Sequence, residues 1–316
     1  MLHKKLFFHL LPNLLLFAGL LFMQIATAQI SSAETYISSI QQWRQQREKE
    51  LKAPKGWLNL EGLFWLHKGV NTFGGSQKND CVYENPDPSD VFFPDHLGNF
   101  ILEGDSVIWE TLDKYTVQVK DQNTALNSKV CIFNDKGLSW EVNWNKIGAS
   151  FSWNIIKREE KIGVRFRNLN STNLSSFTGI EYFPIDEKFK LKAVLQPPIE
   201  SFLMIANVLG QQVASKSAGK LLFTFQNKKY SLDVIDEGEH MLFITFADAT
   251  SGLSTYGSGR FIYIDPPDAN GNTFIDFNKA FNPPCAFTSF ATCPLPPPQN
   301  RLQLAITAGE KNYGHH

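Results

Sequence analysis

The sequence lacks the short motifs that mark the common enzyme classes. It has no Gly-x-Ser-x-Gly nucleophile elbow, no His-Glu-x-x-His zinc helix and no Gly-x-x-x-x-Gly-Lys phosphate loop. Cysteine is scarce as well, with 4 residues, and no Cys-x-x-Cys or His-x-x-x-His spacing indicates zinc. These absences exclude the readily recognised forms of serine hydrolase, zinc protease and P-loop nucleotide-binding protein, and no metal site is predicted.

An excess of charge of one sign is also missing. The chain has 30 Lys and Arg residues against 31 Asp and Glu residues, which gives a formal net charge of -1. A nearly neutral chain offers no general electrostatic attraction to nucleic acid or to an anionic membrane. We therefore expect no nucleic acid among its partners.

One long apolar run stands at the start of the chain. A basic start is followed by apolar residues from Leu6 to Ile25 and then by the small residues Ala26-Thr27-Ala28. This order is typical of a secretory signal peptide, although a run of roughly 20 apolar residues can also span a bilayer. Because Pro12 interrupts the run and the small residues stand at a cleavage distance, we expect residues 1–28 to be a signal peptide. The chain would then be exported, to the periplasm or outside the cell, with no stable membrane insertion after cleavage.

Cysteine usage agrees with an oxidising compartment. Cys81, Cys131, Cys285 and Cys293 all follow the apolar run, and an even number in an exported chain can form disulfides. Sequence alone does not define the connectivity. Cys285 and Cys293 are near neighbours in the chain and are the favoured pair.

A single helix is well indicated after the apolar run. Ser31 and Glu34 fit a capping box, and large side chains then recur at helical spacing from Tyr36 to Leu51. Pro54 and Gly56 end the pattern. We expect an amphipathic helix there.

Beyond this helix the pattern is that of β-strands separated by turns. The predicted strands cover residues 57–66, 100–109 (a hairpin), 138–144, 151–157, 161–167, 189–195, 221–225, 230–235, 241–246, 260–264 and 302–306. Turns rather than helices between strands favour antiparallel sheets. The predicted fold class is mainly β, with antiparallel sandwich or barrel-like sheets and one N-terminal amphipathic helix.

A composition change suggests two β-rich halves. Pro184, Pro197 and Pro198 punctuate the middle of the chain. We place the helix and the first half in residues 29–185, and the second half in residues 186–316. A single large domain remains the alternative.

The last quarter of the chain holds three polar clusters, the first of which contains Asp248, Ser251, Tyr256 and Arg260. The carboxylate, hydroxyl and phenol are candidate catalytic groups, and the guanidinium fork suits a bound carboxylate or phosphate. Alternatively, the short polar side chains fix a turn and Arg260 pairs within the chain. Both interpretations remain open.

The second cluster combines a carboxylate with amides held in constrained backbone. Asp276 is a further catalytic candidate, and Asn278 and Asn282 are candidate ligand-binding residues, the latter oriented by Pro283. Such a set would suit a small polar ligand, or a cation such as calcium. The alternative is a loop stapled by a Cys285–Cys293 disulfide.

The third cluster follows a proline-rich run. Residues 294–298 are Pro-Leu-Pro-Pro-Pro, and they precede Asn300 and Arg301, two more candidate ligand-binding residues. A proline-rich run can be a polyproline ligand for another protein. We favour a rigid crossing that delivers Asn300 and Arg301 to a fixed place.

Two functional hypotheses follow from these clusters. The leading one is a site for a small polar or anionic ligand, with hydrolysis as the reaction considered. The competing one is a non-enzymatic binding or envelope-associated β protein whose C-terminal loops form a structural clasp. The sequence identifies no substrate, reaction or cofactor.

Several sequence blocks carry a family resemblance. The words Gly56-Trp57-Leu58-x-Leu60-x-Gly62-Leu63-x-Trp65-Leu66, Gly69 to Gly74 and the three C-terminal clusters resemble the bacterial and archaeal family called domain of unknown function 1684, DUF1684. The resemblance extends from about the N-terminal helix to Lys311. The family has no established reaction, so the resemblance implies relatives and not a mechanism.

A second resemblance concerns the first half alone. Residues Gly69 to Gly74 and Asn79-Asp80-Cys81-Val82 are similar to the opening strands of a forkhead-associated β-sandwich. This implies a sandwich scaffold. Modules of that fold can bind phosphopeptides through Arg, Ser and Asn, but Gly75 stands where the Arg is expected and no Ser-x-x-His follows. We therefore do not expect phosphopeptide recognition.

Overall fold

The computed structural model describes residues 33–84, 93–112, 114–120, 122, 124–126, 128–239 and 241–314. The expected signal peptide, residues 1–28, lies outside the described residues. The chain divides into two compact units, residues 1–47 and 48–316. Within the described part of the chain, no helix is both long enough and apolar enough to cross a membrane.

The expected amphipathic helix is confirmed over residues 33–52. In the second unit, its last turn buries Leu51 fully in a cluster with Leu58 and Phe287. The helix ends before Pro54, as predicted. Gly56 permits the close turn that follows, because a Cβ at this position would lie 2.1 Å from the carbonyl oxygen of Leu51.

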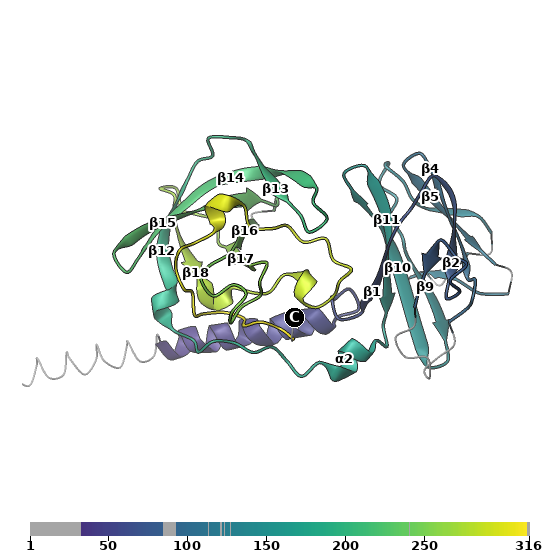
Figure 1. The fold of residues 1–316 in the computed structure, drawn as a ribbon, viewed down its shortest axis with the longest axis horizontal. Helices are drawn as coiled ribbons and strands as arrows, with labels where there is room; N and C mark the ends of the chain where they lie inside the picture. Colours follow the sequence, from purple (N-terminus) through teal and green to yellow (C-terminus); the bar gives the residue numbers. More distant parts are fainter. Residues whose placement is uncertain are drawn as a thin grey trace, which may run out of the picture. The chain divides into compact units, whose positions relative to one another are not determined.

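Strands are the main secondary structure of the second unit, in agreement with the predicted fold class (Figure 1). The strands are β1 Leu60–Trp65, β2 Gly69–Gly74, β3 Cys81–Val82, β4 Gly98–Glu103, β5 Ser106–Thr111, β6 Gln118–Val119, β7 Thr124–Ala125, β8 Val130–Phe133, β9 Glu141–Lys146, β10 Ala149–Arg158, β11 Lys161–Asn168, β12 Lys190–Gln196, β13 Phe202–Ala206, β14 Gln212–Phe225, β15 Lys228–Asp236, β16 Leu242–Phe246, β17 Arg260–Ile264 and β18 Asn272–Asp276. The short helical turns are α2 Thr172–Ser176, η1 Glu187–Phe189, η2 Phe277–Lys279, η3 Pro284–Ala286 and η4 Pro298–Asn300.

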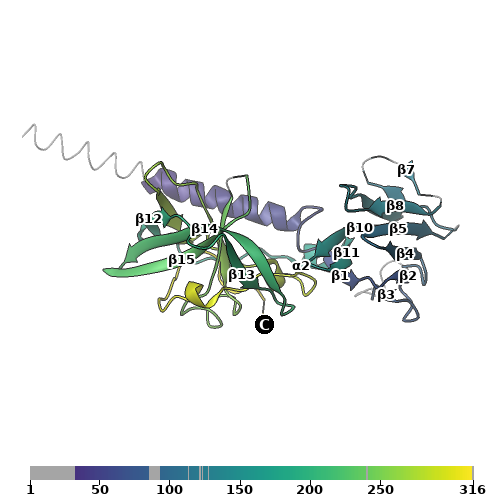
Figure 2. The same ribbon diagram turned by 90° about the horizontal axis from the view of Figure 1, so that it is seen from above.

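The strands from β1 to β11 form a two-layer sandwich (Figure 2). One sheet has six strands in the order β1-β11-β10-β9-β6-β7, and the other has five in the order β3-β2-β4-β5-β8. Neighbouring strands are antiparallel except for β2 and β3, which are parallel. Aromatic rings join the layers, since Phe73 of β2 lies 5.9 Å from Trp153 of β10 and 5.3 Å from Phe166 of β11 between ring centroids.

Both predicted hairpins of the first half are confirmed. β4 and β5 pair across a turn in which Gly104 has φ +58°, and β10 and β11 pair across a turn in which Glu159 has φ +50°. The short polar turn sequences thus fixed the register of these strands.

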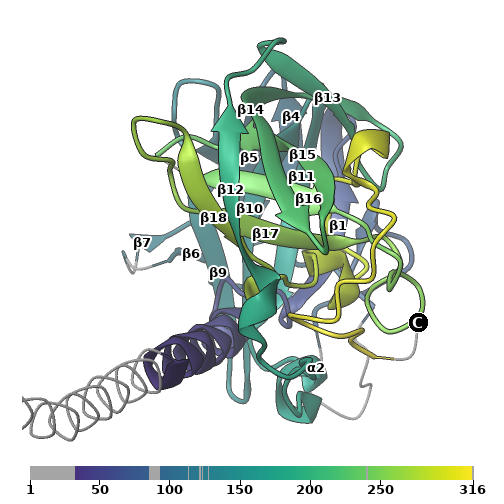
Figure 3. The same ribbon diagram turned by 90° about the vertical axis from the view of Figure 1, so that its left-hand side faces the viewer.

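The remaining strands form a curved sheet in the order β17-β16-β15-β14-β12-β18, with β13 paired to β14 (Figure 3). Its inner face is apolar because alternate residues point inward: Leu221, Phe223 and Phe225 of β14 are buried, whereas Thr224 is exposed. β14 and β15 meet at a two-residue turn in which Gln226 and Asn227 both have positive φ.

The C-terminal segment lines the inner face of this sheet, and the prediction of a strand at residues 302–306 is wrong. Leu302, Ile306 and Ala308 are buried in the hydrophobic core on this face. The segment bonds to the chain just beyond β16, where the amide of Leu302 donates to the carbonyl of Ala247 at 2.8 Å. The alternation of Leu302, Leu304 and Ile306 therefore reflects packing on the concave face and not pairing in a sheet.

Among the described residues, the two largest hydrophobic cores are built from residues between 73 and 166 and from residues between 189 and 308. The boundary expected between residues 185 and 186 lies between these cores. Both cores nevertheless lie in the unit of residues 48–316. The division into residues 29–185 and 186–316 therefore stays a prediction.

Candidate functional site

Arg260 lies at the start of β17, and its side chain is completely enclosed by the chain itself. It is 1% exposed. Nη2 donates to Oδ2 of Asp248 at 2.7 Å and to the carbonyl of Ile306 at 3.0 Å. Nη1 donates to the carbonyl of Ala308 and, at 3.3 Å, to that of Glu310. The guanidinium therefore binds one carboxylate and three carbonyl groups of its own chain.

Asp248 follows β16 and holds the turn that leaves this strand. Its Oδ1 accepts hydrogen bonds from the amide of Thr250, at 2.7 Å, and from the Thr250 hydroxyl. The Thr250 and Thr255 hydroxyl oxygens lie 2.9 Å apart, and the Ser251 hydroxyl accepts from the amide of Asp248 at 3.1 Å. The short polar side chains of the first cluster thus fix a turn, as one of the two interpretations anticipates.

The Asp248–Arg260 ion pair lies in an environment without solvent. Burial lowers the pKa of Arg260 from its ordinary value, while the charge and hydrogen bond of Asp248 oppose this shift. The guanidinium carbon also lies 5.4 Å from the centre of the Phe246 ring. Because a buried charge without a partner is costly, a ligand could reach the Nη atoms of Arg260 only by breaking a buried ion pair.

The second cluster forms an internal tie between two parts of the chain. Asp276 accepts hydrogen bonds from the amide and the side chain of Asn278, both at 3.1 Å. Asn278 is fully buried, accepts from the amide of Asp186 at 3.0 Å and donates to the carbonyl of Asp186 at 2.9 Å. The amide group therefore joins the end of β18 to the segment that precedes β12.

Asn282 of the same cluster holds residues 310 and 311 near the end of the chain. Its amide donates to Oε2 of Glu310 at 2.7 Å, and its side chain donates to the carbonyl of Lys311 at 2.7 Å. Asn282 and Glu310 are both fully buried. Sequence reasoning overlooked Glu310 as a partner of this cluster, and no local pattern marks it.

The third cluster separates its two candidate residues. Asn300 is 1% exposed, accepts from the amide of Asp233 at 2.7 Å and donates to the carbonyls of Asp233 and Thr245. Arg301, in contrast, has an exposed side chain. The proline-rich run thus places the Asn300 side chain against β15 and β16, whereas the Arg301 side chain lies at the surface.

The structure contains a disulfide between Cys285 and Cys293, whose Cα atoms lie 6.3 Å apart. Half-buried Tyr256 donates from its hydroxyl to the carbonyl of Cys285 at 3.3 Å. Cys81 and Cys131 are free thiols. The disulfide closes the loop that follows Asn282.

The candidate residues do not form one shared group. The structure brings Asp248, Ser251 and Arg260 together, and Asn282 approaches them through Glu310. The ties made by Asn278 and by Asn300 are separate from them. Catalytic or ligand-binding roles for these residues stay a hypothesis, and their bonds within the chain support the alternative of a clasp.

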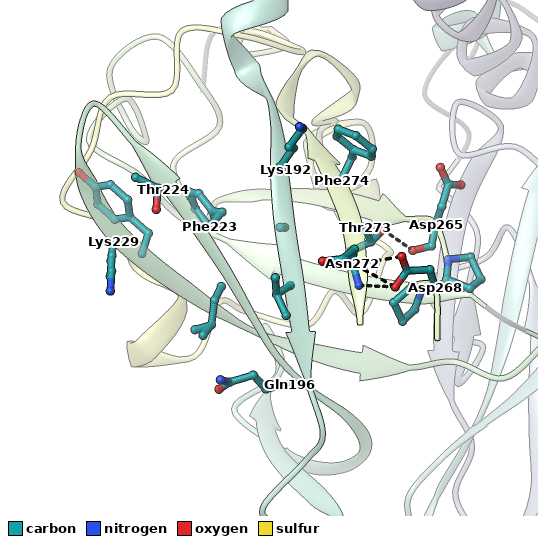
Figure 4. Close-up of a pocket in the computed structure, with 16 residues that line it drawn as sticks. Lys192, Gln196, Phe223, Thr224, Lys229, Asp265, Asp268, Asn272, Thr273 and Phe274 are labelled. Carbon is teal, nitrogen blue, oxygen red and sulfur yellow. Dashed lines mark hydrogen bonds between the residues drawn. The ribbon is translucent and has the colours of Figure 1, made fainter. Parts of the chain in front are cut away.

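A different part of the curved sheet is hollowed and open to solvent. A cavity of about 1190 Å³ lies on the outer face of β12, β14, β15 and β18 (Figure 4). Its lining includes Lys192 and Lys229, together with Val194 and Phe274, which are 41% and 47% exposed. Sequence reasoning did not single out these residues, although the alternation in residues 190–196 places Lys192 and Val194 on one face.

No group of three or more His, Cys, Asp or Glu residues that could hold a metal ion occurs among the described residues. The oxygen atoms of Asp276 and Asn278 bind amides of the chain.

Comparison with known proteins adds relatives but no activity. Residues 175–311 match the model of a family described as a protein of unknown function, DUF1684. The solution NMR structure of an uncharacterised protein from Haloarcula marismortui is 27% identical, over 46% of this chain and 85% of its own, with a TM-score of 0.39. No curated protein matches the chain. The matched residues 175–311 carry all three polar clusters, and the family is the one that the sequence resembles.

Proposed function

We propose that this chain is an exported, non-enzymatic binding protein whose C-terminal clusters form a structural clasp. The observation that carries the proposal is the enclosure of Arg260, which is 1% exposed and bound through both Nη atoms by Asp248 and by carbonyls of residues 306–310. An arginine that recruits a substrate needs free donors. Here the donors hold the chain's own C-terminal segment.

The same reasoning applies to the other buried candidates. A catalytic base or nucleophile must lie within hydrogen-bond reach of a bound substrate. Asp248, Asn278 and Asn300 are at most 8% exposed and bind neighbouring backbone groups. Their polar side-chain atoms bind backbone groups and hold loops in place, which favours the non-enzymatic hypothesis.

The clasp would keep the concave side of the curved sheet closed. Arg260 and Asn282 hold residues 306–311, and Asn300 holds the crossing that precedes them. The apolar inner face is thereby covered, so that binding is left to the outer surface. A rigid scaffold that presents a surface or loop is a common basis for binding.

Two features support export. Residues 1–28 have the order of a signal peptide. The disulfide between Cys285 and Cys293 suits an oxidising compartment such as the periplasm or the extracellular space.

Chemical unfolding of the Arg260→Met variant tests the clasp. Loss of the guanidinium leaves Asp248 buried without its partner, and we expect the free energy of unfolding to fall by about 3–5 kcal/mol. In the Asp248→Asn/Arg260→Met double variant the stranded charge is absent, so part of the loss should be recovered. Arg301→Met is the matched control, because this exposed arginine should change stability by less than about 0.5 kcal/mol.

The ligand-site hypothesis makes the opposite prediction. It requires Arg260→Met to keep the wild-type unfolding free energy while the protein loses a thermal shift given by phosphate, sulfate or small carboxylates. That result would overturn the clasp.

A further inference from the structure

We infer that the outer face of the curved sheet binds a small organic anion with an apolar body, seated between Lys192, Lys229 and Phe274. The inference builds on the proposed function, in which the chain is a binding protein with its clasp elsewhere. It adds the place of binding and the chemical class of the ligand. The cavity of about 1190 Å³ is large enough for a drug-sized molecule, for which pockets of roughly 300–1,000 Å³ are usual.

Strand register builds the floor of this cavity. Val194 of β12 stands opposite Asn272 of β18 on one side and opposite Leu222 of β14 on the other. Two positions along the same strands, Phe274 stands opposite Lys192. Because residues directly opposite each other share a face, these side chains form a continuous outer surface with an apolar centre. Figure 4 shows Lys192 and Phe274 next to each other on their strands.

The two lysines flank a hydroxyl and have no ion-pair partner among the described residues. Thr224 stands opposite Lys229, and its neighbour Phe223 stands opposite Ala193, the residue after Lys192. Adjacent strands lie about 4.8 Å apart, so the flexible lysine stems on β12 and β15 can converge above Thr224. Two ammonium groups and a hydroxyl together suit a carboxylate, sulfonate or phosphate.

Other charges nearby are already engaged. Lys220 forms an ion pair with Asp233 at 3.0 Å, and Lys190 lies 5.5 Å from the centre of the Phe274 ring. Lys190 therefore adds positive charge beside the apolar centre. Lys192 and Lys229 are the lining lysines left for a ligand.

The acidic residues of the cavity lie at its opposite edge, beyond β18. The Asp268 carboxylate accepts hydrogen bonds from the amides of Asn270 and Asn272 and from the Asn272 side chain, which lower its pKa. Asp265 stands in the same loop (Figure 4). Since the strand order is β15-β14-β12-β18, β18 and its neighbour β12 separate this loop from Thr224 and Lys229. The cavity is thus cationic toward β15 and acidic at the β18 edge, which gives an anion a defined orientation.

The apolar part of the ligand is specified by exposed carbon surface. Phe274 and Val194 are 47% and 41% exposed, and Leu222 is half-buried between them and β15. Removing this apolar surface from water is favourable, so a ring or a short acyl chain that covers it would bind more tightly. A purely polar anion would leave this contact unused.

A matched pair of dyes tests the charge and the apolar contact separately. 8-Anilinonaphthalene-1-sulfonate carries an anionic group on an aromatic body, and N-phenyl-1-naphthylamine is its neutral counterpart. In fluorescence titrations of the folded protein we expect the Lys192→Gln/Lys229→Gln variant to bind the sulfonate about tenfold more weakly, with binding of the neutral dye changed less than about twofold. Phe274→Ser should weaken both dyes.

Lys228→Gln is the control for a general loss of charge. Lys228 neighbours Lys229 on β15, so its side chain points to the other face of the strand, and it is absent from the cavity lining. The inference predicts wild-type affinity for this variant. It is overturned if the wild-type protein binds neither dye, if the double variant keeps its affinity for the sulfonate, or if Lys228→Gln weakens binding equally.

This test is independent of the clasp. Near-ultraviolet circular dichroism should show that each lysine variant is folded before titration, since dyes of this kind also bind loosened proteins. A negative dye result would remove the anion site and leave the unfolding result for Arg260→Met unchanged. A failed clasp would instead appear in that unfolding free energy alone.

Discussion

The carboxylate of Glu310 accepts a hydrogen bond from the backbone amide of Asn282 at 2.7 Å, and both residues are fully buried. In the reverse direction, the amide of Glu310 donates to the carbonyl of Ala280 at 2.8 Å. The charge of Glu310 also favours the protonated guanidinium of Arg260, because it opposes the lowering of the Arg260 pKa by burial. One residue near the end of the chain therefore connects the second polar cluster to the first.

Glu310→Ala should destabilise the protein. The substitution leaves the buried amide of Asn282 unpaired, so we expect a loss of about 1–3 kcal/mol in the free energy of unfolding, measured by urea titration. Glu310→Gln keeps an acceptor oxygen and should lose less. Glu181→Ala is the matched control, because that glutamate is 80% exposed in its side chain and pairs with Lys311 only at the surface. Equal effects of Glu310→Ala and Glu181→Ala would contradict the role of Glu310.

Removal of the disulfide should lower stability without abolishing the sheet. Cys285 and Cys293 are 8 residues apart, and closing a loop this short is worth roughly 2–3 kcal/mol in the chain-entropy account. The Cys285→Ser/Cys293→Ser variant should show this loss in urea titrations. Dithiothreitol should lower the midpoint of the wild-type protein and leave that of the variant unchanged; an unchanged wild-type midpoint would argue against the bond.

The two free thiols should differ in reactivity. Cys81 is 2% exposed, and burial raises its pKa to about 12, so almost no thiolate forms at pH 8. Cys131 is only half-buried. Titration with a disulfide reagent should find one reactive thiol in the native protein and none in the Cys131→Ser variant. Rapid labelling of Cys81 in that variant, without denaturant, would be inconsistent with the buried position.

Acid should weaken the sandwich through Glu141. Burial would raise the pKa of Glu141, but Lys120 at 2.6 Å and Lys55 at 3.4 Å hold it below its ordinary value of 4.5. A carboxyl with a lowered folded-state pKa stabilises the fold above its unfolded value, and this contribution is lost as pH falls through the folded value. The stability gap between wild type and Glu141→Gln should therefore be constant above about pH 6 and shrink below pH 4.5. A stability gap that widens toward acid pH would contradict a lowered pKa of Glu141 in the folded protein.

Much of the fold could be predicted because local sequence specifies it. The turn residues at 103–105 and 158–160 set two hairpins, and the spacing of Tyr36 to Leu51 set the helix. Prediction failed where tertiary packing decided the outcome. Residues 302–306 alternate like a strand but line the core, and β13 was overlooked beside Pro197 and Pro198.

The candidate site was harder to predict, because residue type does not reveal burial. Arg260 looks like an anion-binding residue in sequence. Its carbonyl partners at 306 and 308 lie more than 40 residues away along the chain, and only the fold brings them together. Lys192 and Lys229 present the opposite case: strand alternation places them outside, but the hollow they line depends on how the sheet curves.

Native-state amide hydrogen exchange of the C-terminal segment tests the clasp most directly. The amide of Leu302 donates to Ala247 and that of Glu310 to Ala280, both at 2.8 Å, within the tied region. If the segment is a clasp, these amides exchange as slowly as those of β16, since they open only with the whole second core. Exchange as fast as that of an exposed loop, with β16 still protected, would show that the segment is not a clasp and would contradict the account.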